Sequence, residues 1–110
     1  MANIQEHMGV KNLLAEKMED LKGLVLIDVR RPDEFTGELG HIEGAKLVTL
    51  GPDLEEFLQK ADKNLSYLFI CRSGARSTNA CLYAQDLGYS SVINLAGGMM
   101  DWNQKGLPKV

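Results

Sequence analysis

Tyr67-Leu68-Phe69-Ile70-Cys71-Arg72-Ser73-Gly74-Ala75-Arg76-Ser77 is a run of strand-forming residues followed by a cysteine, a short glycine-containing loop and the start of a predicted helix. The first backbone N–H groups of a helix lack partners and carry the positive end of its dipole. Two arginines in this stretch add full positive charge. Each of these effects favours the thiolate of Cys71, which is the nucleophilic form of cysteine. The stretch therefore predicts an anion-binding loop with a reactive sulfur at its base.

Segments that fit strands alternate with segments that fit helices on both sides of this loop. Continuous apolar runs are typical of strands buried on both faces. We expect strands within residues 24–29, 45–50, 65–70 and 91–95, and a fifth short one within residues 4–9. Apolar residues at helical spacing or turn-forming residues predict helices over residues 10–21, 31–35, 53–61, 80–87 and 99–103. Asp53 is expected to cap the third helix, with Glu56 as its capping-box partner.

This alternation predicts an α/β fold, with a mostly parallel sheet of four or five strands and helices on both faces. The length of 110 residues fits one domain spanning residues 1–110. Ligands in such folds bind at the carboxyl ends of the strands. Cys71 follows one of those ends, so the fold and the chemistry of the loop indicate the same place.

The composition narrows the range of partners. The net charge is −3 at pH 7, so the basic surface of a nucleic-acid-binding protein is missing. No apolar run approaches the roughly 18 residues of a membrane span, and no signal-peptide pattern is visible, so we expect a cytoplasmic protein. The two cysteines, Cys71 and Cys81, do not suggest a disulfide framework or a metal site. A positive loop on a mildly acidic chain suits a small anionic substrate.

Three motifs occur in a fixed order along the chain. They are residues 27–35 with 40–45, residues 71–77, and residues 95–102 with 106–108. Together they cover residues 24–108, and on these motifs the chain resembles the single-domain rhodaneses, a family of thiosulfate sulfurtransferases. The resemblance implies a rhodanese-like α/β domain and an enzyme that needs no cofactor. Nothing in the residues calls for more than a monomer.

The resemblance also implies a mechanism and a set of site residues. The Cys71 thiolate would take the outer sulfur of thiosulfate or a similar anionic donor, and the resulting persulfide would pass it to a thiol, cyanide or an acceptor protein. The backbone N–H groups of the loop would hold the persulfide, and Arg72 and Arg76 would bind the donor's sulfonate. The substrate-binding positions are then Arg72, Ser73, Gly74, Ala75 and Arg76, with an ion pair as the alternative role for Arg76.

Several other residues are interpreted as supporting the site. Asp28 and Arg30 end a strand beside it, and we expect a structural ion pair between them. Ser77 is a hydroxyl donor near the sulfur, or bonds locally at the helix start. We expect Cys81 to pack within a helix rather than to act as a resolving thiol. His41 could suggest a Cys–His dyad, but a preformed thiolate needs no general base.

Two other functions use related features. A persulfide carrier or interaction module would form the Cys71 persulfide but would show negligible turnover with small acceptors. A cysteine-dependent phosphatase or arsenate reductase has five residues between its cysteine and its arginine, whereas four separate Cys71 from Arg76. A smaller ring of N–H groups fits one sulfur atom better than a phosphoryl group. Sulfur transfer is therefore the preferred interpretation.

Overall fold

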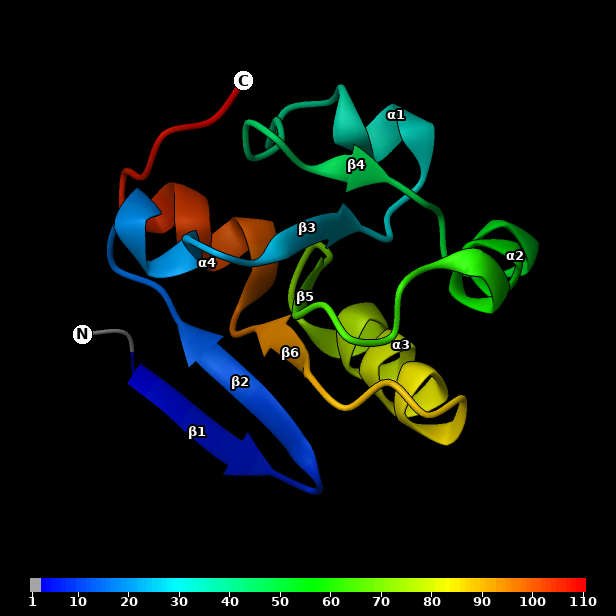
Figure 1. Cartoon of the computed structure of the whole chain (residues 1–110). Helices are drawn as coiled ribbons and strands as arrows, with labels where there is room; N and C mark the ends of the chain where they lie inside the picture. The colour runs from blue at the N-terminus through cyan, green and yellow to red at the C-terminus, as the bar shows by residue number, and fades with distance from the viewer. Residues whose placement is uncertain (1–2) are drawn as a thin grey trace.

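The computed structural model describes residues 3–110, and its strands form one sheet. Residues 1–2 of the predicted domain lie outside the described residues. The sheet has the order β1-β2-β6-β5-β3-β4, with β5 inside it (Figure 1). All neighbours from β2 to β4 are parallel, whereas β1 is antiparallel to β2. The strands are β1 (Asn3–His7), β2 (Val10–Leu14), β3 (Val25–Asp28), β4 (Lys46–Leu47), β5 (Tyr67–Ile70) and β6 (Val92–Leu95).

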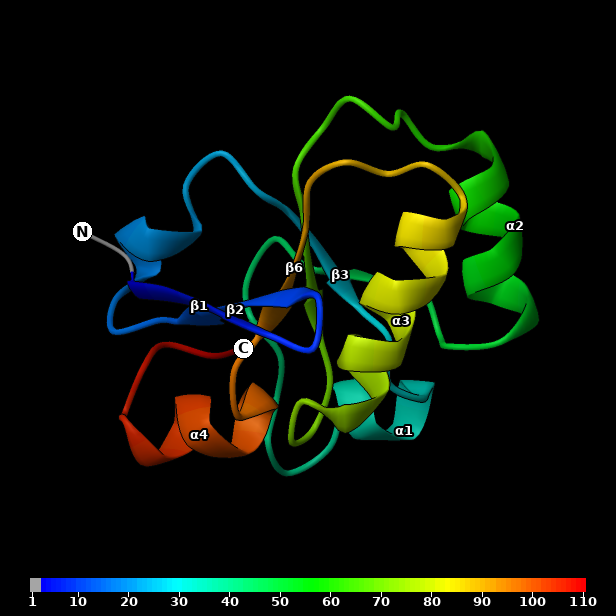
Figure 2. The ribbon, with the colours of Figure 1, turned by 90° about the horizontal axis from the view of Figure 1, so that it is seen from below.

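Helices lie on both faces of the sheet, as the sequence predicted. Figure 2 shows α2 and α3 on one side of the sheet and α4 on the other. The helices are η1 (Met18–Leu21, a 3₁₀ helix), α1 (Pro32–Phe35), α2 (Pro52–Lys60), α3 (Ala75–Asp86) and α4 (Gly98–Gln104). No helix within residues 3–110 is long and apolar enough to cross a membrane.

The side chains of β5 alternate between two apolar clusters because successive residues of a strand face opposite sides of a sheet. Tyr67 and Phe69 belong to the cluster that contains residues of α2 and α3, and Leu68 and Ile70 belong to the cluster that contains residues of α4. Burial on both sides explains the uninterrupted apolar run of β5. Cys71 continues the alternation into the cluster beneath α3.

The helix predicted over residues 10–21 is wrong, because this segment forms β2 and η1. Val10 lies in the cluster beneath α3, whereas Leu13 lies in the cluster beneath α4. Their three-residue spacing therefore places them on opposite faces of a strand rather than on one face of a helix. The strand expected within residues 4–9 is present as β1, and it joins β2 through Met8 and Gly9, which both have positive φ. Within residues 3–110 the sheet thus has six strands rather than four or five.

The predicted start of α2 is also wrong. The helix begins two positions before the expected capping box, with Gly51 as N-cap and Pro52 in the first turn. Proline suits this position because its fixed φ is helical and its missing N–H would have no helical partner there. Asp53 consequently lies inside the first turn instead of capping it.

Backbone contacts join the loop after β5 to the loop before α4. The N–H groups of Met99 and Met100 donate to the carbonyl oxygens of Cys71 and Arg72, both at 2.9 Å. Gly98 has a φ of +57°, and a Cβ on it would lie 2.5 Å from the carbonyl oxygen of Cys71. Only glycine fits this close approach. The third sequence motif therefore holds the loop of the second in place.

Candidate active site

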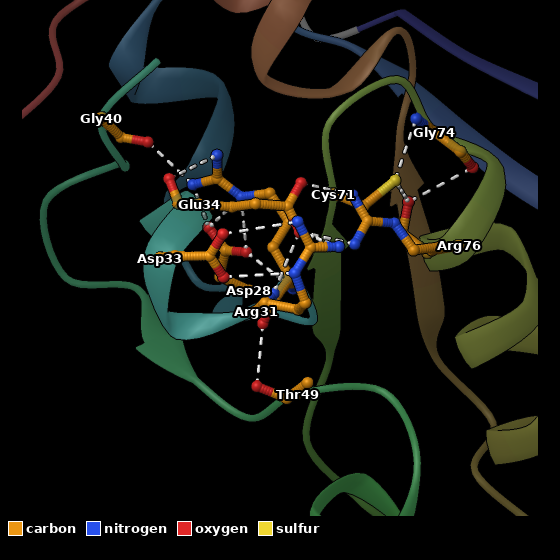
Figure 3. A network of polar contacts seen from close by, with 11 residues as sticks. Asp28, Arg31, Asp33, Glu34, Gly40, Thr49, Cys71, Gly74 and Arg76 are labelled. Atoms are coloured by element: carbon orange, nitrogen blue, oxygen red, sulfur yellow. Dashed lines mark hydrogen bonds and ion pairs between the residues drawn. The ribbon is translucent and has the colours of Figure 1, made fainter. Parts of the chain in front are cut away.

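The loop after β5 turns its backbone toward the sulfur of Cys71. Gly74 is the N-cap residue of α3 and has a φ of +104°, a left-handed conformation that glycine adopts without steric cost. This conformation directs the Gly74 N–H to Cys71 Sγ at 3.0 Å (Figure 3). The loop thus closes around the sulfur instead of extending into solvent.

Cys71 is buried, with 1% of its surface exposed, yet its sulfur has polar partners. The hydroxyl of Ser77, itself fully buried, lies 3.3 Å from Sγ and adds to the N–H of Gly74. Sγ is therefore enclosed by hydrogen-bond donors on the side of the loop and of α3. Donors in these positions, here called the cradle, stabilise a negative charge on sulfur.

The cradle changes the acidity of the thiol. Burial is the largest single influence on Cys71 and favours the neutral thiol. The hydroxyl of Ser77 and the backbone N–H groups of Ser77, Gly74 and Ser73 act in the opposite direction. Together these donors outweigh burial, so the pKa of the Cys71 thiol lies below its ordinary value. A larger fraction of the sulfur is then nucleophilic near neutral pH than in a free cysteine.

Arg72, Ser73 and Ala75 are exposed on the outside of the loop. Arg72 borders a surface cavity of about 450 Å³, which also contacts Met100 and Glu38. The cavity lining includes residues of α1 and α4 but not Cys71, whose sulfur lies inside the loop. Donor binding by Arg72 stays a prediction.

The guanidinium of Arg76 forms a bidentate ion pair with Glu34. Both N···O distances are 2.7 Å, and the pair joins α3 to α1 across 42 residues of sequence. Arg76 is 33% exposed and Glu34 14% exposed. Hydrogen bonding from Arg76 outweighs the effect of burial and lowers the pKa of Glu34 to about 2. The structure therefore places Arg76 in the alternative role, an ion pair, and its binding of a donor sulfonate stays a prediction.

Replacing Glu34 with glutamine should lower the free energy of unfolding by about 1–2 kcal/mol at neutral pH, because Arg76 loses its charged partner. In the native protein this contribution is complete above pH 4.5, the ordinary pKa, and is lost as the pH falls toward about 2. Glu34→Gln should lack this part of the acid dependence. Urea denaturation between these pH values measures both effects.

Glu56→Gln is the matched control, because the Glu56–Lys60 pair is 70% and 74% exposed. Such a pair contributes less than about 1 kcal/mol. Equal stability of Glu34→Gln and the native protein would contradict a stabilising role for the pair with Arg76.

The predicted ion pair between Asp28 and Arg30 is confirmed. Arg30 Nη2 lies 2.8 Å from Asp28 Oδ2, and both side chains are at most 1% exposed. The same guanidinium donates to the carbonyl oxygens of Gly40 at 2.7 Å and Glu34 at 3.2 Å. Arg30 thereby ties the end of β3 to α1 and to the loop that follows it. Through Glu34 and Arg76, this framework reaches α3, the helix that carries Ser77.

The sequence did not single out Glu34, Asn94 or Asn12, which all lie near the site. Glu34 pairs with Arg76. Asn94 accepts a short hydrogen bond from Ser77 and donates to Asn12 Oδ1 at 2.7 Å. The signal for Asn94 was a lone amide within the apolar strand of residues 92–95. A buried polar side chain in such a strand needs hydrogen-bond partners, and those of Asn94 are Ser77 and Asn12.

Other candidate groups have structural roles. Cys81 is fully buried beneath α3, and burial raises the pKa of its thiol to about 12, which suits the predicted packing role. His41 Nδ1 lies 2.9 Å from the carbonyl oxygen of Phe35, and the two rings stack with centroids 3.7 Å apart. In the part of the chain that the structure describes, no group of three His, Cys, Asp or Glu residues could hold a metal ion.

A family model and several named relatives place this chain in one family. A family model described as "Rhodanese-like domain" matches residues 10–105. YtwF of Bacillus subtilis (strain 168), named as a candidate sulfurtransferase, is 43% identical over 87% of this chain and 89% of that protein. A protein of Allochromatium vinosum named sulfurtransferase is 34% identical over 88% of each chain. A solved rhodanese-like domain protein from Staphylococcus aureus is 30% identical over 81% of this chain and 83% of that chain, with a TM-score of 0.67.

Proposed function

This chain belongs to the family of rhodanese-like domains, and from that membership we propose that it is a sulfurtransferase with Cys71 as its nucleophile. The observation that carries the proposal is the surrounding of one sulfur by the Gly74 N–H at 3.0 Å and the Ser77 hydroxyl at 3.3 Å. These donors favour a charged sulfur. The names of the relatives support the same chemistry.

The first half-reaction loads the sulfur. The Cys71 thiolate attacks the outer sulfur of thiosulfate, a new S–S bond forms, and the donor's S–S bond breaks as sulfite leaves with the electron pair. The charge then lies on the outer sulfur of the persulfide. Cys71 is only 1% exposed, and residues 72, 73 and 75 are the exposed part of its loop, so we propose that these residues shift as the donor approaches. We propose that Arg72, which borders the surface cavity, binds the donor's anionic end.

The second half-reaction removes the sulfur. Cyanide or a thiol attacks the outer sulfur of the persulfide, the S–S bond to Cys71 breaks, and Cys71 leaves as a thiolate. Cyanide gives thiocyanate, and a thiol gives a new persulfide. The stabilised thiolate helps both halves, as a nucleophile in the first and as a leaving group in the second. An acceptor protein with an accessible thiol follows the same route.

A phosphatase function is disfavoured by the position of Arg76. Its guanidinium pairs with Glu34 at 2.7 Å, so it is not free to bind a phosphoryl group above Cys71. The four-residue spacing between Cys71 and Arg76 disfavours the same function. A persulfide carrier shares the first half-reaction with the proposed enzyme and differs only in turnover.

The test is the release of thiocyanate from thiosulfate and cyanide under steady-state conditions. We expect turnover with ping-pong kinetics, because sulfite leaves before cyanide reacts. A persulfide without turnover would reassign the protein as a carrier. Hydrolysis of an aryl phosphate faster than thiosulfate turnover would overturn the proposal. The monomeric state and the cytoplasmic location expected from the sequence stay predictions.

The pH dependence of the first half-reaction follows from the lowered pKa of Cys71. Single-turnover loading with thiosulfate should rise with pH as the thiolate forms, and should level off below the ordinary pKa of a cysteine thiol. A cysteine peptide of similar length, treated with the same donor, serves as the reference for that ordinary value. If the loading rate of the protein levels off at the same pH as that of the peptide, or at a higher pH, the cradle does not stabilise the thiolate.

A further inference from the structure

The hydroxyl of Ser77 has one proton and three acceptors within reach. Cys71 Sγ and the carbonyl oxygen of Gly74 each lie 3.3 Å from Ser77 Oγ, and Asn94 Oδ1 makes the shortest contact. A hydroxyl can donate only one hydrogen bond at a time. Whichever acceptor takes the proton determines how much Ser77 stabilises a negative charge on Cys71.

The amide of Asn94 is fixed by a chain of hydrogen bonds that ends on the backbone. The Asn12 side-chain N–H donates to the carbonyl oxygen of Val10 at 3.1 Å, so Asn12 Oδ1 faces the other way. Asn94 Nδ2 then donates to Asn12 Oδ1 at 2.7 Å. This leaves Asn94 Oδ1, an acceptor without a proton, facing Ser77.

We propose that Asn94 is a positioning residue that draws the Ser77 proton away from Cys71 and thereby favours the persulfide over the free thiolate. This inference rests on the proposed sulfur transfer. In the free thiolate the charge lies on Sγ, and the Ser77 hydroxyl can donate its hydrogen bond either to Sγ or to Asn94 Oδ1. In the persulfide the charge moves to the outer sulfur, and Ser77 can donate to Asn94 without loss. Asn94 therefore biases the equilibrium toward the loaded form.

Burial makes the competition effective. Ser77 is fully buried and Asn94 is 3% exposed, so water does not replace a lost partner. A buried acceptor without a donor is costly, and a hydrogen bond to a charged group is stronger than one between neutral groups. The carbonyl oxygen of Gly74 also accepts from Thr78, so in the free thiolate each position of the Ser77 proton leaves either Sγ or Asn94 Oδ1 without this donor. The persulfide removes this conflict.

The other charged groups around the sulfur do not depend on Asn94. Arg76 on α3 pairs with Glu34, and Asp28 at the end of β3 pairs with Arg30. Arg72 lies on the exposed side of the loop. Cys81, the other thiol in the cluster beneath α3, has a pKa raised to about 12 by burial and stays neutral. A change at Asn94 therefore acts on Cys71 through Ser77.

The experiment compares Asn94→Leu with the native protein. We expect the thiolate absorbance of Cys71 to appear at lower pH, because Ser77 then donates to Sγ alone. We also expect the thiosulfate–sulfite loading equilibrium, measured by mass spectrometry, to shift roughly three- to tenfold toward the unloaded protein. Ser77→Ala should move the titration to higher pH. In the Ser77→Ala background, Asn94→Leu should have no further effect.

Asn12→Ala provides a second route if Asn94→Leu does not fold. Without Asn12 Oδ1, the Asn94 amide can rotate and donate to Ser77 Oγ, which leaves the Ser77 proton to Sγ and again lowers the titration midpoint. Ser91→Ala is the control, because it removes a 2.7 Å hydroxyl bond to Ser66 away from the sulfur. It should leave the midpoint unchanged.

An unchanged or raised midpoint in a folded Asn94→Leu protein would overturn the proposal. The same shift with and without Ser77 would overturn it too, because the effect would not pass through the hydroxyl. The titration needs no sulfur donor, so it separates this inference from the proposed function. If the titration shifts occur as expected but thiosulfate is not turned over, the proposed function is rejected. The role of Asn94 in setting the acidity of Cys71 is then retained.

Discussion

Replacing Cys71 with serine should lower kcat/KM for thiosulfate by roughly 10³-fold or more, because the reaction loses its nucleophile. A serine hydroxyl does not ionise near neutral pH, and it cannot form the S–S bond of a persulfide. The hydrogen-bond donors of the loop would remain but would have no thiolate to stabilise. Release of thiocyanate from thiosulfate and cyanide measures the loss.

Cys81→Ala is the matched control for this substitution. It removes the second thiol of the chain, which is buried in the cluster beneath α3 and has a pKa of about 12. We expect near-native turnover, with a modest loss of stability from the small cavity. Activity that survives in Cys71→Ser but disappears in Cys81→Ala would show that Cys81, and not Cys71, is the nucleophile.

Replacing Arg30 with leucine should lower the free energy of unfolding by about 3–5 kcal/mol, because the carboxylate of Asp28 would stay buried without its partner. Arg30 and Asp28 are 1% and 0% exposed, so solvent cannot compensate. The variant also loses the bonds from Arg30 to Gly40 and Glu34, which hold the loops beside the site. Urea denaturation at neutral pH, with circular dichroism as the signal, measures the change.

Arg31→Leu separates burial from charge. Arg31 is the next residue and is 62% exposed; it pairs with Asp33, which is 71% exposed, and more distantly with Glu34 at 3.6 Å. Loss of such a pair changes stability by less than about 1 kcal/mol. Similar losses for Arg30→Leu and Arg31→Leu would show that the buried pair has no special structural role.

The position of Cys71 at the site could be predicted because its signals are local. A strand, a cysteine, a glycine and two arginines follow one another within residues 67–77, and the geometry of a helix start adds the rest. The residues that tune the sulfur were harder to find, because they reach it from distant segments.

Glu34 and Asn94 illustrate this limit. Glu34 meets Arg76 across 42 residues, and Asn94 meets Ser77 across 17. Nothing in the local sequence indicates which carboxylate faces Arg76, and the predicted sulfonate-binding role did not consider Glu34. The lone asparagine in an apolar strand was a usable signal, since a buried amide needs partners.

The fold was predictable where apolar runs are continuous and ambiguous where they are sparse. Continuous apolar runs predicted the strands β3, β5 and β6, because a strand that packs on both faces is apolar along its length. In β2, Val10 and Leu13 contact opposite clusters, and polar residues lie between them. That spacing also fits a helix, and only the pairing of β2 with β1 and β6 resolves it.

The central claim is that Cys71 carries the transferred sulfur, and peptide mass spectrometry after thiosulfate treatment tests it most directly. We expect the peptide that contains Cys71 to gain one sulfur atom, about 32 Da, and to lose it on addition of cyanide. The Cys71→Ser protein should show no such adduct. An adduct on Cys81 alone, or none on the native protein after treatment with thiosulfate and with a polysulfide donor, would contradict the account.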